Sequence, residues 1–414
     1  MKKKRVVITG MGVVSPLGSD LQEFWTAIKN GQIGIQGLTK LSTEHYKGNP
    51  IAAEVKGTET LAFEGLDQLS EYSQAVYYAT AATKLSLVDA GLTENIEEDN
   101  NYGLIIGTTS GNQDMVERTI NNFEIESRDD ELNPNAAEML AHFRPIELSA
   151  KVASLCNFGG TNMVIPTACA AGNYAFGTAY SMIQQGRTPV IVAGGADPFT
   201  RSCYTIFYRL GAMTQTNIQP FDENRTGMVV GEGAAMLVLE ELDHALARNA
   251  NIYAEVKGYG LACDAYHPTT PDPDGSGAIL AMNKALDMSQ LSVEEIDYIS
   301  AHGTGTKAND AHEAKAMNKV FGTQLQNMPV SGIKSMLGHC MGAASALEGV
   351  ASVMSIQDQI IPPTMNTASL DPTFSQAFVV TSKAIEDRPV ENVISNAFAF
   401  GGNICSVIFG KYNN

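Results

Sequence analysis

Three residues combine a reactive side chain with surroundings suited to chemistry: Cys169, His302 and His339. Cys169 follows a short apolar run ending at Pro166 and precedes an Ala-rich run that predicts a helix. Pro166 and Thr167 are expected to close a strand and cap that helix. Unpaired N–H groups at a helix start lower a thiol pKa from about 8.5 and supply thiolate. The alternative is a buried structural thiol, the common state of an unpaired cysteine.

Both histidines stand in glycine-containing loops next to expected regular elements. His302 lies in Ala-His-Gly-Thr-Gly-Thr, just after an expected strand at 296–301, and His339 ends Lys-Ser-Met-Leu-Gly-His before a helical run. Loops held by rigid elements often carry catalytic groups. A further glycine loop at 398–403 could bring backbone N–H groups close to a ligand. We expect the other histidines to be ordinary core or surface residues: His45, His142, His244, His267 and His312.

The elements that must position these residues alternate between strand-like and helix-like runs. Strands are expected at 6–10, 102–109, 190–196, 252–260, 296–301, 393–398 and 405–410. Helices are expected at 20–30 (with Asp20 as its cap), 70–92, 240–250, 276–287 and 348–357. This alternation predicts an α/β fold. Each half carries its own strands, so the pattern also favours a duplicated core.

Composition limits the function classes. The 414 residues are 44% apolar and 17% charged, typical of a folded chain with one large core or two fused halves. No apolar run reaches the length of about 20 residues that spans a bilayer. The net charge of −18 argues against nucleic acid and anionic membrane surfaces as partners. Six cysteines without CxxC spacing suggest neither disulfides nor a zinc site, and we expect a cytoplasmic protein.

The landmarks taken together resemble the β-ketoacyl-acyl-carrier-protein synthases of the elongating, type II kind, over essentially the whole chain. The matching segments are Val-Ile-Thr-Gly-Met-Gly-Val-Val-Ser-Pro-Leu-Gly at 7–18, Thr-Ala-Cys-Ala at 167–170, Pro-Phe-Asp at 220–222 with Arg225, Gly-Glu-Gly-Ala at 231–234, Ala-His-Gly-Thr-Gly-Thr at 301–306, Asn-Asp at 309–310, Lys-Ser-Met-Leu-Gly-His at 334–339 and Asn-Ala-Phe-Ala-Phe-Gly-Gly at 396–402. The resemblance implies the thiolase fold, in which two similar βαβ-rich halves pack as five α-β-α-β-α layers. We expect the nucleophile half at 1–250, the histidine half at 251–414, and a dimer.

The resemblance also implies a role for each matching residue. Cys169 would hold the acyl group, and the N–H groups of Cys169 and Phe400 would form an oxyanion hole. His302 and His339 would stabilise the enolate formed when a malonyl thioester loses carbon dioxide. Lys334 would complete the catalytic set by buttressing the histidines, and Glu313 would support them. Substrate-lining roles would fall to Thr304, Thr306, Phe398 and Phe400. The partners implied are an acyl carrier protein with its acyl and malonyl thioesters, whose phosphopantetheine arm arrives with the substrate; no metal or free cofactor is implied.

Some residues depart from the family pattern. Ala399 stands where the phenylalanine gate usually has glycine, so its methyl group is expected to restrict the gate or shift the hinge elsewhere. The loop at 108–111 is small and polar where fatty-acid enzymes place a bulky apolar residue. Asp67 and Glu71 stand where relatives often offer basic residues to the carrier, although Arg209 remains. These departures favour a specialised polyketide, polyene or other fatty-acyl pathway, with the housekeeping fatty-acid enzyme as the alternative.

Two other functions are weighed against this one. A cysteine hydrolase is considered because His302 lies 133 residues after Cys169, close to papain-like spacing. Against this function, a hydrolase mechanism would not need the second histidine, His339, or Lys334. A non-catalytic subunit like the chain-length factors is the second, but those proteins lack the nucleophile that Cys169 supplies. The chain could still need such a subunit as the partner of a heterodimer.

Overall fold

The computed structural model describes residues 3–58, 61–69, 71–92, 101–126, 143–374 and 377–413. Within these ranges, eleven strands form one continuous sheet made of two arrays. The first array runs in the order β1 (Val6–Val14), β7 (Gly233–Glu241), β6 (Val190–Asp197), β4 (Gly103–Gly107) and β5 (Asn162–Ile165). The second runs β8 (Ala254–Cys263), β13 (Asn403–Gly410), β12 (Asn392–Phe398), β9 (Tyr298–Ser300), β10 (Pro329–Ser331) and β11 (Phe378–Val379).

The two arrays repeat one topology. In each, the first three strands are antiparallel and the strands that follow continue in parallel, two in the first array and three in the second. β1 and β8 join them through the pairs Val7↔Glu255 and Ile8↔Ala254. The same strand order in both arrays is the duplicated core that the sequence predicts. A separate small sheet pairs β2 (Gln36–Gly37) with β3 (Ile51–Ala52).

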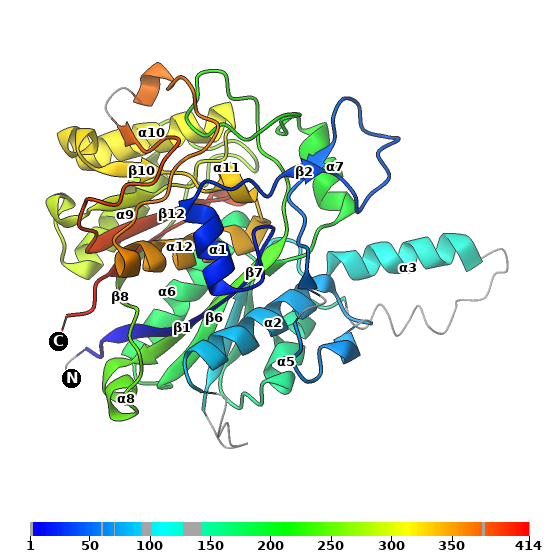
Figure 1. The fold of residues 1–414 in the computed structure, drawn as a ribbon, viewed down its shortest axis with the longest axis horizontal. Coiled ribbons are helices and arrows are strands. Elements are labelled where there is room, and N and C mark those ends of the chain that lie inside the picture. Colours follow the sequence, from blue (N-terminus) through cyan, green and yellow to red (C-terminus); the bar gives the residue numbers. More distant parts are fainter. Residues whose placement is uncertain are drawn as a thin grey trace.

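Helices complete the layers on both sides of each array. The helices are α1 (Leu21–Lys29), α2 (Gln74–Asp89), α3 (Gln113–Glu126), α5 (Pro145–Leu155), α6 (Ala171–Gln184), α7 (Arg201–Arg209), α8 (Leu242–Ala247), α9 (Ser276–Ser289), α10 (Lys307–Phe321), α11 (Lys334–Leu337) and α12 (Ala344–Asp358). Helices α2 and α5 cover the outer face of the first array, and α9 with α10 cover that of the second (Figure 1). Helices α6 and α12 pack against each other between the arrays (Figure 1). The five α-β-α-β-α layers of the thiolase fold follow from this arrangement.

The strand pleat divides the core among these layers. On β4, Ile105 joins the central core around α6 and α12, while Leu104 and Ile106 face the outer core under α2 and α5. The central helices are buried nearly all round, which is why they are rich in Ala and Gly instead of amphipathic. A Cβ on Gly172 of α6 would lie 2.6 Å from the backbone nitrogen of Ala346, so the two helices need that glycine to approach.

Most expected elements are present, with shifted ends. Asp20 caps α1 as predicted, by accepting from the N–H groups of Gln22 and Glu23. The helix expected at 70–92 begins at Gln74 behind a Ser73 cap, and Ser70 lies outside the described residues. Helix α10 was not expected, because its buried face includes the polar Asp310, His312 and Glu313 and so shows no clear apolar stripe.

Candidate active site

Cys169 lies where the chain passes from β5 to the central helix α6. The 3-10 turn Ala168–Ala170 leads into α6, so the predicted helix start at Cys169 is confirmed. Ala168 has a φ of 52°, in the left-handed region that non-glycine residues seldom adopt. The predicted cap is wrong: Thr167 makes no side-chain capping bond. The strained turn is therefore held by packing, because Cys169 and Ala170 are buried at its base.

The charge state of the thiol differs from the prediction. Burial raises the pKa of Cys169 to about 12, and nearby Lys334 lowers it only in part. Asp197 raises it further, since a carboxylate disfavours a second negative charge. The expectation of a low pKa is thus wrong for the resting protein, because loss of hydration outweighs the helix start. The raised pKa favours the protonated thiol in the resting protein.

His302 is fixed through its backbone by α10. Glu313 accepts from the N–H groups of His302 at 2.8 Å and of Gly303 at 2.9 Å. Burial raises the pKa of Glu313 to about 8, although these two bonds lower it. Glu313 therefore lies next to His302, and its carboxyl group bonds to the backbone of the loop and not to the ring.

Lys334 contacts the ring of His302. Its ammonium nitrogen lies 3.2 Å from His302 Nδ1 and 2.6 Å from the His302 carbonyl oxygen, and it also pairs with Glu348. An ammonium group donates only, so Nδ1 is the acceptor and the neutral ring carries its proton on Nε2. His302 therefore presents an N–H donor on the side away from Lys334.

His339 also carries its proton on Nε2, but a different group bonds to its Nδ1. The Met341 N–H donates to His339 Nδ1 at 3.2 Å, which leaves the proton on Nε2. Burial lowers the pKa of His302 and of His339 well below the usual value, and Lys334 lowers both further. The two rings stand edge to face with centroids 5.6 Å apart. The site thus holds two adjacent, neutral N–H donors.

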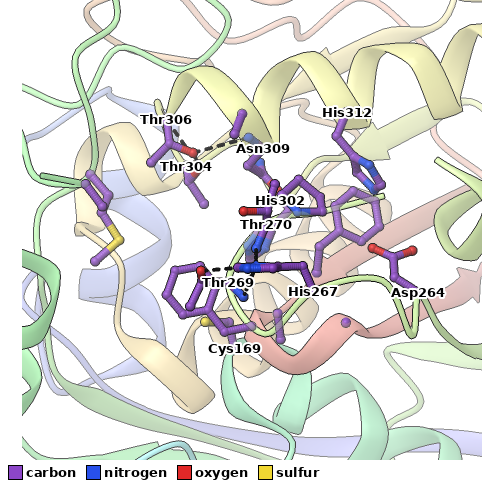
Figure 2. A pocket seen from close by; sticks show the side chains of 18 of the residues that line it. Cys169, Asp264, His267, Thr269, Thr270, His302, Thr304, Thr306, Asn309 and His312 are labelled. Atoms are coloured by element: carbon purple, nitrogen blue, oxygen red, sulfur yellow. Dashed lines mark hydrogen bonds between the residues drawn. The ribbon is translucent and has the colours of Figure 1, made fainter. Parts of the chain in front are cut away.

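One cavity joins these groups. Cys169, His302 and His339 line it together, so the structure brings the three predicted residues to one space. The lining also includes Thr304, Thr306, Phe398 and Phe400. Figure 2 shows Thr304 and Thr306 above Cys169, their hydroxyl oxygens 2.9 Å apart.

Two histidines that we expected to be ordinary residues also line this cavity. His267 is exposed at its mouth, and His312 is buried in its wall (Figure 2). His267 is a surface residue and His312 is a core residue, as expected, but the loop at 264–271 and helix α10 also bring both of them to the cavity. His45 is exposed and His244 pairs with Glu240, as expected, while His142 lies outside the described residues.

Two carboxyl groups near the site were missed by the sequence analysis. Asp197, at the end of β6, accepts from the backbone N–H groups of Thr109, Ser110 and Gly342 at 2.6–2.7 Å and from the Thr108 hydroxyl at 2.9 Å. Burial raises the pKa of Asp197 to about 6. Glu348 pairs with Lys334 from within α12. Asp197 has no local signal, since it bonds to segments about 90 and 145 positions away, and Glu348 pairs with a residue 14 positions away in a different helix.

The gate segment follows β12. Ala399 is extended, with φ −142° and ψ 156°, a conformation open to any residue. Positive φ values occur instead at Gly401 (80°) and Gly402 (75°). Phe400 is 37% exposed, and its ring lies against Phe207 with centroids 5.5 Å apart. The methyl group of Ala399 therefore adds no strain to the conformation present here.

Other kinds of site are absent from the described part of the chain. No three His, Cys, Asp or Glu residues there lie together in a way that could hold a metal ion. All six cysteines are free thiols. None of the described helices is both long and apolar enough to span a bilayer.

Comparison with known proteins gives the family. The model of the β-ketoacyl synthase N-terminal domain matches residues 3–245, and that of the C-terminal domain matches residues 253–368. The chain belongs to the β-ketoacyl synthase family. It is an acyltransferase-class enzyme that carries out condensation in fatty-acid or polyketide biosynthesis.

Individual relatives include members from both kinds of pathway. A 3-oxoacyl-[acyl-carrier-protein] synthase 2 of Synechocystis is 35% identical, with 100% of this chain and 99% of the relative covered. The solved ishigamide ketosynthase/chain length factor is 38% identical with a TM-score of 0.92, covering 99% of this chain and 100% of that one. A type II polyketide ketosynthase, solved in complex with its acyl-carrier protein, is 28% identical with a TM-score of 0.90 and full coverage of both chains.

Proposed function

We propose that this ketosynthase extends a Cys169-bound acyl chain with malonyl-acyl-carrier protein to give a 3-oxoacyl-carrier protein. The observation that carries the proposal is one cavity containing a buried thiol and two neutral imidazoles whose protons are on Nε2. The thiol is a suitable nucleophile, and the paired N–H donors suit a developing enolate oxygen. A hydrolase would have no use for the second donor or for buried Lys334.

The first half-reaction transfers the acyl group. Cys169 sulfur bonds to the thioester carbonyl carbon, the bond from that carbon to the arm sulfur breaks, and the thiol proton passes to the departing arm. The oxyanion formed on the way is stabilised by the backbone N–H groups of Cys169 and Phe400. Because the thiol is protonated at rest, arrival of the substrate must promote its ionisation. Acyl-Cys169 is neutral, which suits a buried position.

The second half-reaction forms the carbon–carbon bond. The malonyl arm enters past Thr304 and Thr306, and its thioester oxygen accepts from Nε2–H of His302 and of His339. Loss of carbon dioxide leaves an electron pair on the α-carbon as an enolate, which the two donors stabilise. That carbon bonds to the carbonyl carbon of acyl-Cys169, the bond from that carbon to the Cys169 sulfur breaks, and the released thiolate takes up a proton from water. Lys334 and Glu313 act as positioning residues for His302, while Phe398 and Phe400 bound the substrate space.

We further infer the setting of the reaction. The division into a nucleophile half at 1–250 and a histidine half at 251–414 is supported by the repeated strand order. The small polar loop at 108–111 and the 38% identity to the ishigamide ketosynthase/chain length factor favour a specialised polyketide or polyene pathway over housekeeping synthesis. That relative also supports a dimer, either with a second copy or with a chain-length-factor-like subunit. We place the enzyme in the cytoplasm, with no cofactor beyond the pantetheine arm of its substrate.

Intact mass spectrometry tests this function. The protein and a Cys169→Ala variant are exposed to a panel of acyl-carrier thioesters, and malonyl-carrier is then added. We expect an acyl adduct only with Cys169 present, discharged as a product longer by two carbons. No adduct with any donor contradicts catalysis by this chain alone and favours the partner-subunit function. Equal rates for ordinary saturated chains on the housekeeping carrier contradict the specialised pathway.

A further inference from the structure

His312 is a histidine in the cavity wall that the mechanism above does not use. It comes from α10, the helix that also supplies Glu313, and its side chain is 5% exposed. Its ring packs edge to face against Phe398, with centroids 5.6 Å apart. Phe398 in turn lies 5.7 Å from the ring of His302. His312 is thus separated from the reacting centre by a single aromatic ring.

The bonding of His312 fixes its tautomer. Nδ1 lies 2.8 Å from the carbonyl oxygen of Asp272, and a carbonyl only accepts, so Nδ1 is the donor. The neutral ring then has a lone pair on Nε2. Among the described residues, this nitrogen is buried and has no hydrogen-bond partner. A buried acceptor without a partner is costly and calls for an explanation.

The surroundings of His312 indicate what kind of partner is missing. Thr304, Thr306 and Asn309, all from the start of α10 or the loop before it, line the same cavity (Figure 2). An acceptor on this wall can pair with an N–H or O–H donor that a ligand in the cavity supplies. The pantetheine arm that the proposed function brings here carries two amides, each with an N–H group that loses its water on entry.

We infer that His312 Nε2 accepts a hydrogen bond from an amide N–H of the pantetheine arm and so selects arm-bearing thioesters. This inference rests on the proposed ketosynthase function of the same cavity. The bond contributes to binding of the arm and not to the chemical steps at Cys169. Its loss raises KM for arm-bearing substrates and leaves thioesters without amides unaffected.

Substitutions with Asn and with Gln distinguish the roles of the two ring nitrogens of His312. His312→Asn keeps a donor near the Nδ1 position for Asp272 but has no acceptor at Nε2. His312→Gln extends an amide oxygen toward the Nε2 position and gives up the Nδ1 bond. Each variant is preloaded with acyl group, and kcat/KM is measured with malonyl-pantetheine and with malonyl ethyl thioester, which lacks the amides.

The ratio of the two kcat/KM values is the readout. We expect it to fall about tenfold in His312→Asn, as the loss of one neutral hydrogen bond implies, through KM and not kcat, and to stay near wild type in His312→Gln. An unchanged ratio in His312→Asn overturns the inference. A ratio that falls only in His312→Gln also overturns the inference, because it would show that His312 acts by holding the loop through its bond to Asp272.

A structure of the unmodified protein soaked with pantetheine tests the inference without any variant. An amide nitrogen within about 3.2 Å of Nε2 supports it, and a water molecule bonded to Nε2 beside the bound arm overturns it. A wild-type protein that condenses neither thioester contradicts the proposed function instead, and the soaked structure then still decides the role of His312.

Discussion

Lys334 and Glu348 form an ion pair whose side chains are only 2% and 1% exposed. Removing one partner leaves a buried charge, so we expect Lys334→Met to lower the free energy of unfolding by about 3–5 kcal/mol. The double variant Lys334→Met/Glu348→Leu should recover much of that stability without recovering malonyl decarboxylation, because His302 has lost its Nδ1 partner. Chemical denaturation and carbon dioxide release measure the two effects.

The control for this experiment is the exposed pair Lys411–Glu391, 48% and 52% exposed. Lys411→Met should change stability by less than about 1 kcal/mol. A double variant that decarboxylates malonyl thioesters at the wild-type rate would contradict the positioning role of Lys334.

The raised pKa of Cys169 predicts its reactivity with pH. Below a pKa of about 12, thiolate is a minor species whose fraction grows with each pH unit. We therefore expect iodoacetamide labelling of Cys169 to rise about tenfold per unit between pH 7 and 9. Peptide mass mapping in a Cys263→Ala background, which removes the exposed thiol, gives the rate. A plateau below pH 8 would instead indicate a thiolate stabilised by the helix start.

At the scale of elements, Asp197 joins β6, the loop after β4 and the turn before α12. Both carboxylate oxygens of Asp197 accept hydrogen bonds, Oδ2 from the N–H groups of Thr109 and Gly342. In Asp197→Asn the NH2 group replaces one of these oxygens and would point at N–H groups that it cannot pair with. Each buried N–H left unpaired costs about 1–3 kcal/mol. We expect a lower Tm and slower acylation of Cys169, while Asp387→Asn at an exposed position changes neither. Wild-type acylation by Asp197→Asn would show that this junction does not position the thiol.

The gate segment gives a second prediction for an element. Gly401→Ala places a methyl-bearing residue at φ 80°, which costs about 1–2 kcal/mol, so the acylation rate should fall about tenfold. Ala399→Gly should stay within about twofold, since Ala399 is already extended. Acyl transfer followed by mass spectrometry compares the two. A larger effect at Ala399 than at Gly401 would place the hinge at the earlier residue.

The sequence predicted those parts of the molecule that have a local signal. The buried strands, Asp20 as a cap and the turn at Cys169 are all visible in short runs of residues. The site groups that depend on distant segments were harder to predict: Asp197 acts on residues about 90 and 145 positions away. The thiol pKa was mispredicted for a similar reason. The helix start is visible in the local sequence, whereas the burial that raises the pKa depends on the whole fold. His312 was missed because no pattern in α10 shows which loop will cover it.

At the scale of the whole molecule, β5 forms one edge of the sheet built by the described residues. The carbonyl group of Thr161 accepts from Leu104 of β4, and that of Ile165 accepts from Thr108 just after it. The intervening Asn162 and Val164 therefore direct their backbone groups to the free edge. An unpaired edge favours association with another strand. We expect Val164→Pro, which removes an outward N–H, to weaken dimerisation, whereas Val164→Ala keeps it. Sedimentation of the purified pair measures the assembly, and an unaltered Val164→Pro dimer would place the interface elsewhere.

The repeated topology extends to single backbone angles. Ala168, before α6, has a φ of 52°, and Met341, before α12, has a φ of 51°. The first of these turns carries the thiol, and the second follows His339 by two residues. Two copies of one tight turn therefore meet at the centre of the fold, but they hold different chemistry. Because both turns belong to one polypeptide, each can carry its own residues, which two identical subunits under a symmetry axis cannot do. A scaffold with repeated topology therefore holds an asymmetric reaction centre.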